Sequence, residues 1–157
     1  MIYIVFGLSL LVALIDYIIK ILVMNNLKPI GSLTVIPGLF SLTYVENKGA
    51  AFGMLSNARW VFILFTIIVI IALCYVVIKK KIDSKLFNAA AVLIIGGGIG
   101  NLIDRIFYGY VVDYLSVSFF PPVCNFADYC VTVGAGLMVI YLIFCTDIFE
   151  KKDKKNG

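Results

Sequence analysis

Long apolar runs alternate with short polar segments along this chain of 157 residues. Four of the runs reach the roughly 20 residues that an α-helix needs to cross the hydrocarbon core of a bilayer. They cover residues 2–24, 60–78, 86–108 and 129–149. The pattern therefore predicts four membrane-spanning helices.

The run at 2–24 differs from a cleavable signal sequence in three respects. It has no basic segment ahead of it, it contains Asp16 and Lys20, and no small-residue cleavage motif lies near its end. We expect this run to be retained as a helix.

The composition is that of an integral membrane protein. Hydrophobic residues make up 62% of the chain and charged residues only 14%, whereas soluble domains carry about a quarter charged residues. We therefore expect a single membrane domain over 1–157. The net charge of +4 does not indicate nucleic-acid binding, because most of the basic residues lie in two clusters, KKKIDSK at 79–85 and KKDKK at 151–155.

Both basic clusters flank apolar runs, and loops rich in lysine and arginine stay on the cytoplasmic side of a membrane. The loop at 79–85, the tail at 150–157 and the N terminus are therefore expected in the cytoplasm. The segments at 25–59 and 109–128 are then extracytoplasmic.

The first external segment contains a stretch, FSLTYVE at 40–46, in which Phe40, Leu42 and Tyr44 occupy alternate positions. A period of two residues predicts short strands. The expected fold class is membrane all-α: a four-transmembrane-helix bundle with a small extracytoplasmic β-sheet cradle between helices 1 and 2.

Cysteine and histidine usage excludes several kinds of site. The chain has four cysteines without a Cys-x-x-Cys pair, and it has no histidine, so HExxH zinc proteases and Ser-His-Asp triads are excluded. Cys124 and Cys130 could form a disulfide only in an oxidising compartment, which is the less favoured alternative. No metal and no cofactor are expected.

Ionisable residues inside a predicted span are costly and often functional. Asp16 and Lys20 are four residues apart, so they share a helix face and can pair. The pair either makes its own charges tolerable or supports a functional interior, and the sequence leaves both alternatives open.

The stretch GGGIGNLIDR at 96–105 resembles a nucleotide-binding loop but lies inside a spanning run, which excludes that interpretation. Gly96 and Gly100 form a GxxxG pattern that favours close helix packing. Asn101, Asp104 and Arg105 share one side of this helix at its outer end. They form a polar cavity or, alternatively, interfacial anchors, and the cavity is favoured.

Two aspartates stand in apolar surroundings close to span ends. Asp113 and Asp128 have no basic residue between them, and burying an uncompensated charge is expensive. Two neighbouring carboxylates can share a proton, so that one activates a water molecule while the other donates to a carbonyl group. The spacing alone does not establish that they meet. The stretch ENKGAAFG at 46–53 either offers free backbone groups to a peptide or is a tight turn.

Together these motifs resemble those of the lipoprotein signal peptidases (signal peptidase II), from the first span to the fourth. The matching pieces are Asp16 with Lys20, NKGAAFG from Asn47, GGGIGNLIDR, VVDY ending on Asp113 and Tyr114, and NFAD from Asn125 to Asp128. Each motif alone is weak, but five in the same order on four spans are specific.

The resemblance implies an aspartic endopeptidase of the bacterial cytoplasmic membrane, with its active site at the extracytoplasmic face. Such enzymes remove signal peptides from prolipoproteins, cut before a diacylglyceryl-modified cysteine and are inhibited by globomycin. The implied partners are these substrates and membrane lipids, and a monomer is expected. The implied catalytic residues are Asp113 and Asp128; the implied site-lining residues are Asn47, Gly49, Asn101, Arg105, Asn125 and Ala127; and the implied supporting polar residues are Asp16, Lys20 and Asp104.

Two other functions compete with this one. A small ion-coupled transporter would use Asp16 or Asp104 as a proton-linked carboxylate near mid-span, but most of the acids cluster at the outer ends. A non-catalytic scaffold would use its polar groups only for helix assembly, and replacement of Asp113 or Asp128 by asparagine would then be harmless.

Overall fold

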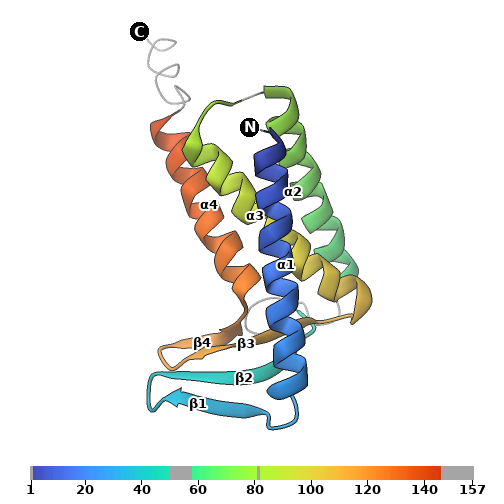
Figure 1. The fold of residues 1–157 in the computed structure, drawn as a ribbon, viewed down its shortest axis with the longest axis vertical. Coiled ribbons are helices and arrows are strands. Elements are labelled where there is room, and N and C mark those ends of the chain that lie inside the picture. The colour runs from blue at the N-terminus through green and yellow to red at the C-terminus, as the bar shows by residue number, and fades with distance from the viewer. Residues whose placement is uncertain (1, 50–57, 81, 146–157) are drawn as a thin grey trace.

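The computed structural model describes residues 2–49, 58–80 and 82–145. Four long helices run side by side (Figure 1). They are α1 (Ile2–Asn26), α2 (Arg59–Lys80), α3 (Lys85–Phe107) and α4 (Phe126–Phe144). All four are long and apolar enough to cross a membrane, which confirms the predicted bundle. The C-terminal end of the fourth predicted span, 146–149, lies outside the described residues.

Helix α3 packs against each of the other three helices. Glycines permit this central position, because a Cβ atom on Gly96 would lie 2.7 Å from the backbone oxygen of Ser9 in α1. A Cβ atom on Gly100 would collide with the carboxylate of Asp16. The predicted role of the GxxxG pattern in helix packing is therefore confirmed.

A four-stranded antiparallel sheet closes one end of the bundle (Figure 1). Its strands, in spatial order, are β1 (Ser32–Ile36), β2 (Phe40–Asn47), β3 (Val111–Val117) and β4 (Phe120–Cys124). The sheet was expected from the first external segment alone, but each external segment contributes one hairpin. Pairing of β2 with β3 sets Val45 opposite Asp113 and Asn47 opposite Val111.

Strand β4 was missed because it contains Pro121 and Pro122. Proline cannot donate a ladder hydrogen bond and so argues against a strand, except at the edge of a sheet. Strand β4 is such an edge strand. The start of α4 also differs from the expected residue 129: the helix begins at Phe126, so Asp128 lies in its first turn.

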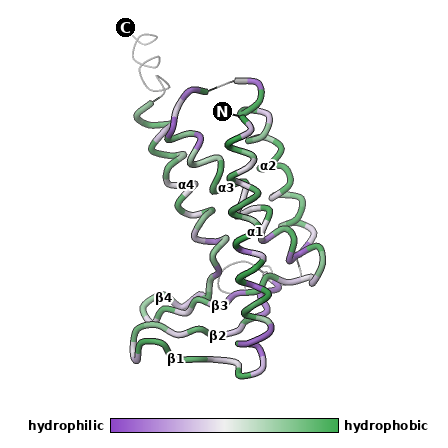
Figure 2. The backbone as a smooth tube through the Cα atoms, in the orientation of Figure 1, coloured by the Kyte–Doolittle hydropathy of each residue, from purple (hydrophilic) through white to green (hydrophobic). Residues whose placement is uncertain are grey.

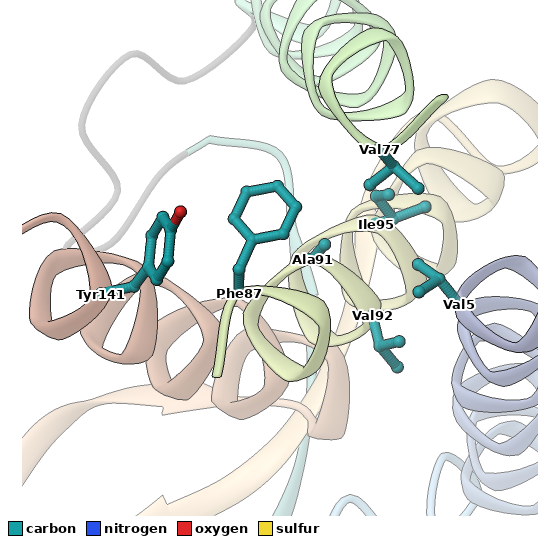
Figure 3. Packing of buried hydrophobic residues seen from close by; sticks show 7 residues of the cluster. All are labelled: Val5, Val77, Phe87, Ala91, Val92, Ile95 and Tyr141. Atoms are coloured by element: carbon teal, nitrogen blue, oxygen red, sulfur yellow. The ribbon is translucent and has the colours of Figure 1, made fainter. Parts of the chain in front are cut away.

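The two ends of the bundle are held together in different ways. Away from the sheet, the core is apolar and includes Val5, Val77 and Ile95 (Figure 3). There the rings of Phe87 and Tyr141 lie 5.3 Å apart between centroids. Toward the sheet, polar residues gather where the helices meet the strands (Figure 2). The polar end is therefore where the candidate functional residues converge.

Two glycines of α4 provide a matched test of close packing. A methyl group at Gly134 would lie 2.8 Å from Ile94 Cγ1, whereas one at Gly136 would meet nothing within 4 Å. Overpacking costs about 1–3 kcal/mol, so we expect Gly134→Ala to lower the melting temperature measured in detergent. Gly136→Ala should cause no loss, because alanine is the better helix former. Equal melting temperatures for the two variants would contradict this account of the α3–α4 contact.

Candidate active site

A buried ammonium group organises the polar end of the bundle. Lys20 Nζ lies 2.8 Å from Asp16 Oδ2 and 2.9 Å from Asp104 Oδ2. It also donates a hydrogen bond of 2.9 Å to Asn101 Oδ1. The charged side chains are at most 1% exposed, so each buried charge has a partner, as a low-dielectric interior requires. The predicted pairing of Asp16 with Lys20 is confirmed.

The two carboxylates of this cluster also bind backbone groups of other elements. Asp16 Oδ1 accepts the N–H of Ala127 at 3.0 Å, and Asp104 Oδ2 accepts the N–H of Val112 at 3.0 Å. Val112 directly precedes Asp113, and Ala127 directly precedes Asp128. The cluster therefore fixes the backbone next to each candidate catalytic aspartate.

Asp113 lies on β3 and is 1% exposed. Its two oxygens accept hydrogen bonds from amide groups: Asn47 Nδ2 at 2.8 Å and Asn125 Nδ2 at 2.6 Å. Both amides are held in orientation, because Asn47 Oδ1 accepts the N–H of Gly49 and Asn125 Oδ1 accepts the N–H of Asp128. Each therefore presents its NH₂ group to Asp113.

Asp128 occupies the first turn of α4 and takes part in a capping box. Its Oδ2 accepts the backbone N–H of Asn125 at 3.1 Å, and Asn125 Oδ1 accepts the N–H of Asp128 at 2.9 Å. Its Oδ1 accepts Asn101 Nδ2 at 2.8 Å. Helix N-termini favour negative charge, so this position suits a carboxylate.

Asn125 connects the two candidate aspartates. It is fully buried, and it donates through its side chain to Asp113 and through its backbone to Asp128. The two carboxylates therefore share Asn125 as a hydrogen-bond donor. The structure thus brings together five residues that the family resemblance implied as site residues: Asn47, Asn101, Asp113, Asn125 and Asp128.

Burial, together with the nearby Asp128 carboxylate, raises the pKa of Asp113 to about 7. The hydrogen bonds from Asn47 and Asn125 act in the opposite direction but are outweighed. Asp113 therefore changes between its neutral and ionised forms close to neutral pH, which suits a group that exchanges protons during a reaction.

Two hollows border Asp128. One, of about 230 Å³, lies among α2, α3 and α4, and its lining includes Thr66, Asn101 and Arg105. The other, of about 370 Å³, lies between the β3–β4 hairpin and α4. Thr132 lines both hollows. A substrate held in either hollow reaches Asp128.

Arg105 lies at the wall of the smaller hollow. It is half-buried; its guanidinium group is 5.1 Å from the ring centroid of Phe62, and Nη1 donates to the backbone oxygen of Asn101 at 3.4 Å. Asn101 and Arg105 line one cavity together, as predicted, but most of its wall is apolar and includes Phe65, Ile70 and Ile94. Asp104 instead turns to the ion cluster around Lys20.

The two remaining expected residues, Gly49 and Ala127, contribute to the site through their backbone N–H groups. Gly49 donates its N–H to Asn47, and Ala127 is fully buried with its N–H bound to Asp16. A Cβ atom on Gly97 would lie 2.6 Å from the oxygen of Ala127, so α3 and α4 touch at this point. Residues 50–53 of the ENKGAAFG stretch lie outside the described residues.

Two contributing residues were not found from the sequence. The Tyr114 hydroxyl accepts the N–H of Phe126 at 3.2 Å, and burial raises the pKa of Tyr114, so its hydroxyl is neutral. Thr132 borders both hollows, and its position one helical turn after Asp128 was a signal that could have located it. Cys124 and Cys130 are free thiols. Over residues 2–49, 58–80 and 82–145, no group of three metal-binding side chains occurs.

Comparison with known proteins agrees with this geometry. A family described as Signal peptidase (SPase) II matches residues 8–144. The lipoprotein signal peptidase of Caldanaerobacter subterraneus subsp. tengcongensis is 48% identical over 133 residues, which are 85% of this chain and 91% of that protein. The lipoprotein signal peptidase of Halothermothrix orenii is 46% identical over 142 residues, covering 90% and 94%. This chain belongs to the signal peptidase II family.

Solved structures of bacterial membrane enzymes share the fold. One superimposes with a TM-score of 0.81 at 34% identity and covers 94% of this chain and 90% of its own. A second has a TM-score of 0.79 at 35% identity, with 90% and 94% covered. As a member of the family, this protein is a peptidase that removes signal peptides from prolipoproteins, and it is a multi-pass protein of the bacterial inner membrane. The transporter and scaffold alternatives are therefore wrong.

Asp113 makes the stability of this signal peptidase II depend on pH. Because its pKa is raised from 3.8 to about 7, the folded chain holds this proton more tightly than the unfolded chain does, and stability falls as pH rises between these values. The upper bound of this loss is on the order of 4 kcal/mol, at about 1.4 kcal/mol per pH unit.

Asp113→Asn removes this titration. We expect the melting temperature of the variant, relative to that of the parent, to rise between about pH 5 and about pH 8. Effects of the substitution that do not depend on pH, such as altered hydrogen bonding, do not contribute to this change with pH. Asp83→Asn is a control for removal of an exposed carboxylate. A difference that does not change with pH would contradict the raised pKa of Asp113.

Proposed function

We propose that Asp113 and Asp128 are the catalytic pair of this peptidase. The observation that carries the proposal is the double hydrogen bonding of Asn125, which donates to Asp113 at 2.6 Å and to Asp128 at 3.1 Å. In the active form one carboxyl group is protonated and the other is ionised, because two close carboxylates do not readily ionise together.

The reaction uses these two groups and a water molecule. The ionised carboxylate takes a proton from water, whose oxygen attacks the scissile carbonyl carbon, while the protonated carboxyl donates its proton to the carbonyl oxygen. When the tetrahedral intermediate collapses, the C–N bond breaks, the departing nitrogen receives the proton held by the former base, and the other carboxylate takes a proton from a hydroxyl of the intermediate, which restores the pair. Asn47, Asn101 and Asn125 hold the carboxylates in place through amide donors.

We propose that cleavage occurs immediately before a diacylglyceryl-modified cysteine. The substrate then combines an apolar signal peptide with acyl chains, and it reaches the site by lateral diffusion in the membrane. Support comes from the two hollows at Asp128, one between helices and the other beside the sheet. Lipid partners follow from the same substrate, and we propose that the protein acts as a monomer.

We also propose that the sheet and the active site face the outside of the cell, and that both termini are cytoplasmic. The lysine-rich connection between α2 and α3 and the N-terminal end of α1 lie at the end of the bundle opposite to the sheet (Figure 1). The positive-inside rule places such a connection in the cytoplasm.

Replacement of either aspartate tests the catalytic pair. We expect Asp113→Asn and Asp128→Asn each to lower the cleavage rate of a diacylglyceryl-modified prolipoprotein peptide in detergent by at least about a hundredfold, the usual contribution of general acid–base catalysis. Asp83→Asn is the matched control, and circular dichroism verifies folding of each variant. Parental activity in a folded Asp113→Asn variant would remove Asp113 from the mechanism while leaving the family assignment intact.

Arg105 offers a planar set of donors to substrate carbonyl oxygens from the wall of the smaller hollow. Lysine lacks this fork, so we expect Arg105→Lys to raise KM about tenfold, with a smaller effect on kcat. Arg59→Lys is the matched control, because Arg59 also packs over an aromatic ring, that of Trp60 at 5.1 Å, without lining this hollow. Unchanged KM in Arg105→Lys would show that the guanidinium group does not bind substrate.

A further inference from the structure

The two hollows at Asp128 differ in the chemistry of their walls. The smaller one is mixed: beside the apolar side chains of Phe65, Val69, Ile70, Ile94 and Val131, it is lined by the polar residues Thr66, Asn101 and Arg105. The larger one is lined, apart from the shared Asp128 and Thr132, by aromatic, aliphatic and thiol side chains: Val117, Phe119, Phe120, Cys124 and Tyr129. A peptide segment needs partners for its backbone groups, whereas an acyl chain needs none.

The wall of the larger hollow is uncharged except at Asp128. Burial raises the pKa of the Cys124 thiol to about 11, so this side chain is neutral. The hollow also continues into an apolar outer surface, because Phe119 and Phe120 of the hairpin and Tyr129 and Val133 of α4 are exposed. An acyl chain can therefore reach the hollow over an apolar surface.

The position of the lipid on the substrate limits where it can bind. If cleavage occurs before the modified cysteine, the diacylglyceryl group is carried by the residue directly after the scissile bond. Its subsite must then adjoin the catalytic carboxylates, and the segment before the bond must leave in another direction. Both hollows adjoin Asp128. One offers polar groups, as a peptide backbone requires, and the other is almost entirely apolar, as an acyl chain allows.

We propose that the hollow between the β3–β4 hairpin and α4 receives the diacylglyceryl group of the substrate, and that the smaller hollow among α2, α3 and α4 receives the signal-peptide segment before the scissile bond. This assignment rests on the proposed cleavage before a lipid-modified cysteine. It names a subsite for the lipid and a separate one for the peptide.

The lipid subsite contributes mainly to the orientation of the substrate and little to its binding affinity. Membrane hydrocarbon is as apolar as a side-chain pocket, so an acyl chain gains little from leaving the bilayer. Holding the modified cysteine beside Asp128 instead places the scissile carbonyl group in a reactive geometry, and small misplacements cost large factors in rate.

Photocrosslinking tests the assignment. The probe is a prolipoprotein peptide whose cysteine carries a diacylglyceryl group with a diazirine on an acyl chain close to the ester. It is bound to Asp113→Asn, which leaves the lining of both hollows unchanged, irradiated, digested and mapped by mass spectrometry. A diazirine-bearing phospholipid provides the background. We expect adducts above background to lie within 117–132. Adducts on α2 at 65–70, or a distribution equal to the background, would overturn the proposal.

A matched pair of substitutions sharpens the result. Val117 lines the larger hollow and Val69 the smaller one, so Val117→Phe and Val69→Phe add the same bulk on either side of Asp128. In the Asp113→Asn background, we expect Val117→Phe to lower the adduct yield at 117–132 at least about fivefold through overpacking, and Val69→Phe to leave the adduct position unchanged. Loss of these adducts only in Val69→Phe would overturn the assignment.

Cleavage of the same probe by the parent enzyme separates the two proposals. If the parent cuts before the modified cysteine but the adducts lie elsewhere, the subsite assignment is wrong and the proposed function stands. If the parent does not cut there, the proposed function fails first, and the subsite assignment fails with it.

Discussion

The structure depends on keeping one ammonium group buried. Lys20 has three N–H donors, and its three partners are Asp16, Asp104 and Asn101. A charge inside a membrane protein is tolerated only when its partners satisfy it, so these groups must be assembled whenever the protein is folded.

Each partner of Lys20 also makes a second contact: Asp16 with Ala127, Asp104 with Val112 and Asn101 with Asp128. The groups that stabilise the buried Lys20 charge therefore also fix the positions of both proposed catalytic residues.

This arrangement explains why close helix packing and site geometry are linked. Gly100 leaves the space that the Asp16 carboxylate occupies, so α1 and α3 can approach at the level of Lys20. The far end of the bundle holds the helices together through an apolar core around Val5, Val77 and Ile95. The polar end does not have to stabilise the bundle alone, and its groups can be arranged for chemistry.

The sequence predicted the helices better than it predicted which residues come together in the fold. Apolar length gave the four helices, and the spacing of Asp16 and Lys20 gave their pair, because both follow from helix geometry alone. Strand β4 was missed, since Pro121 and Pro122 argue against a strand unless it is known to be at an edge, and the hairpin that it forms with β3 was missed with it. The start of α4 was placed too late, although Asn125 followed by Asp128 has the spacing of a capping box. The approach of Asp113 to Asp128 depends on the β3–β4 hairpin, which turns the chain back, so only the family resemblance predicted it.

A protease at the edge of a membrane must meet two opposed requirements. Water has to reach the carboxylates, while signal peptide and acyl chains remain among apolar groups. The fold separates these requirements by placing the two proposed catalytic residues where the sheet meets the helices, with Asp113 on a strand and Asp128 on a helix. Burial at this position raises the pKa of Asp113 into the neutral range. The exclusion of water that suits the apolar substrate therefore also lets a carboxyl group carry a proton at neutral pH. An aspartate pair therefore suits this location without histidine, because the apolar surroundings themselves provide the proton-carrying form.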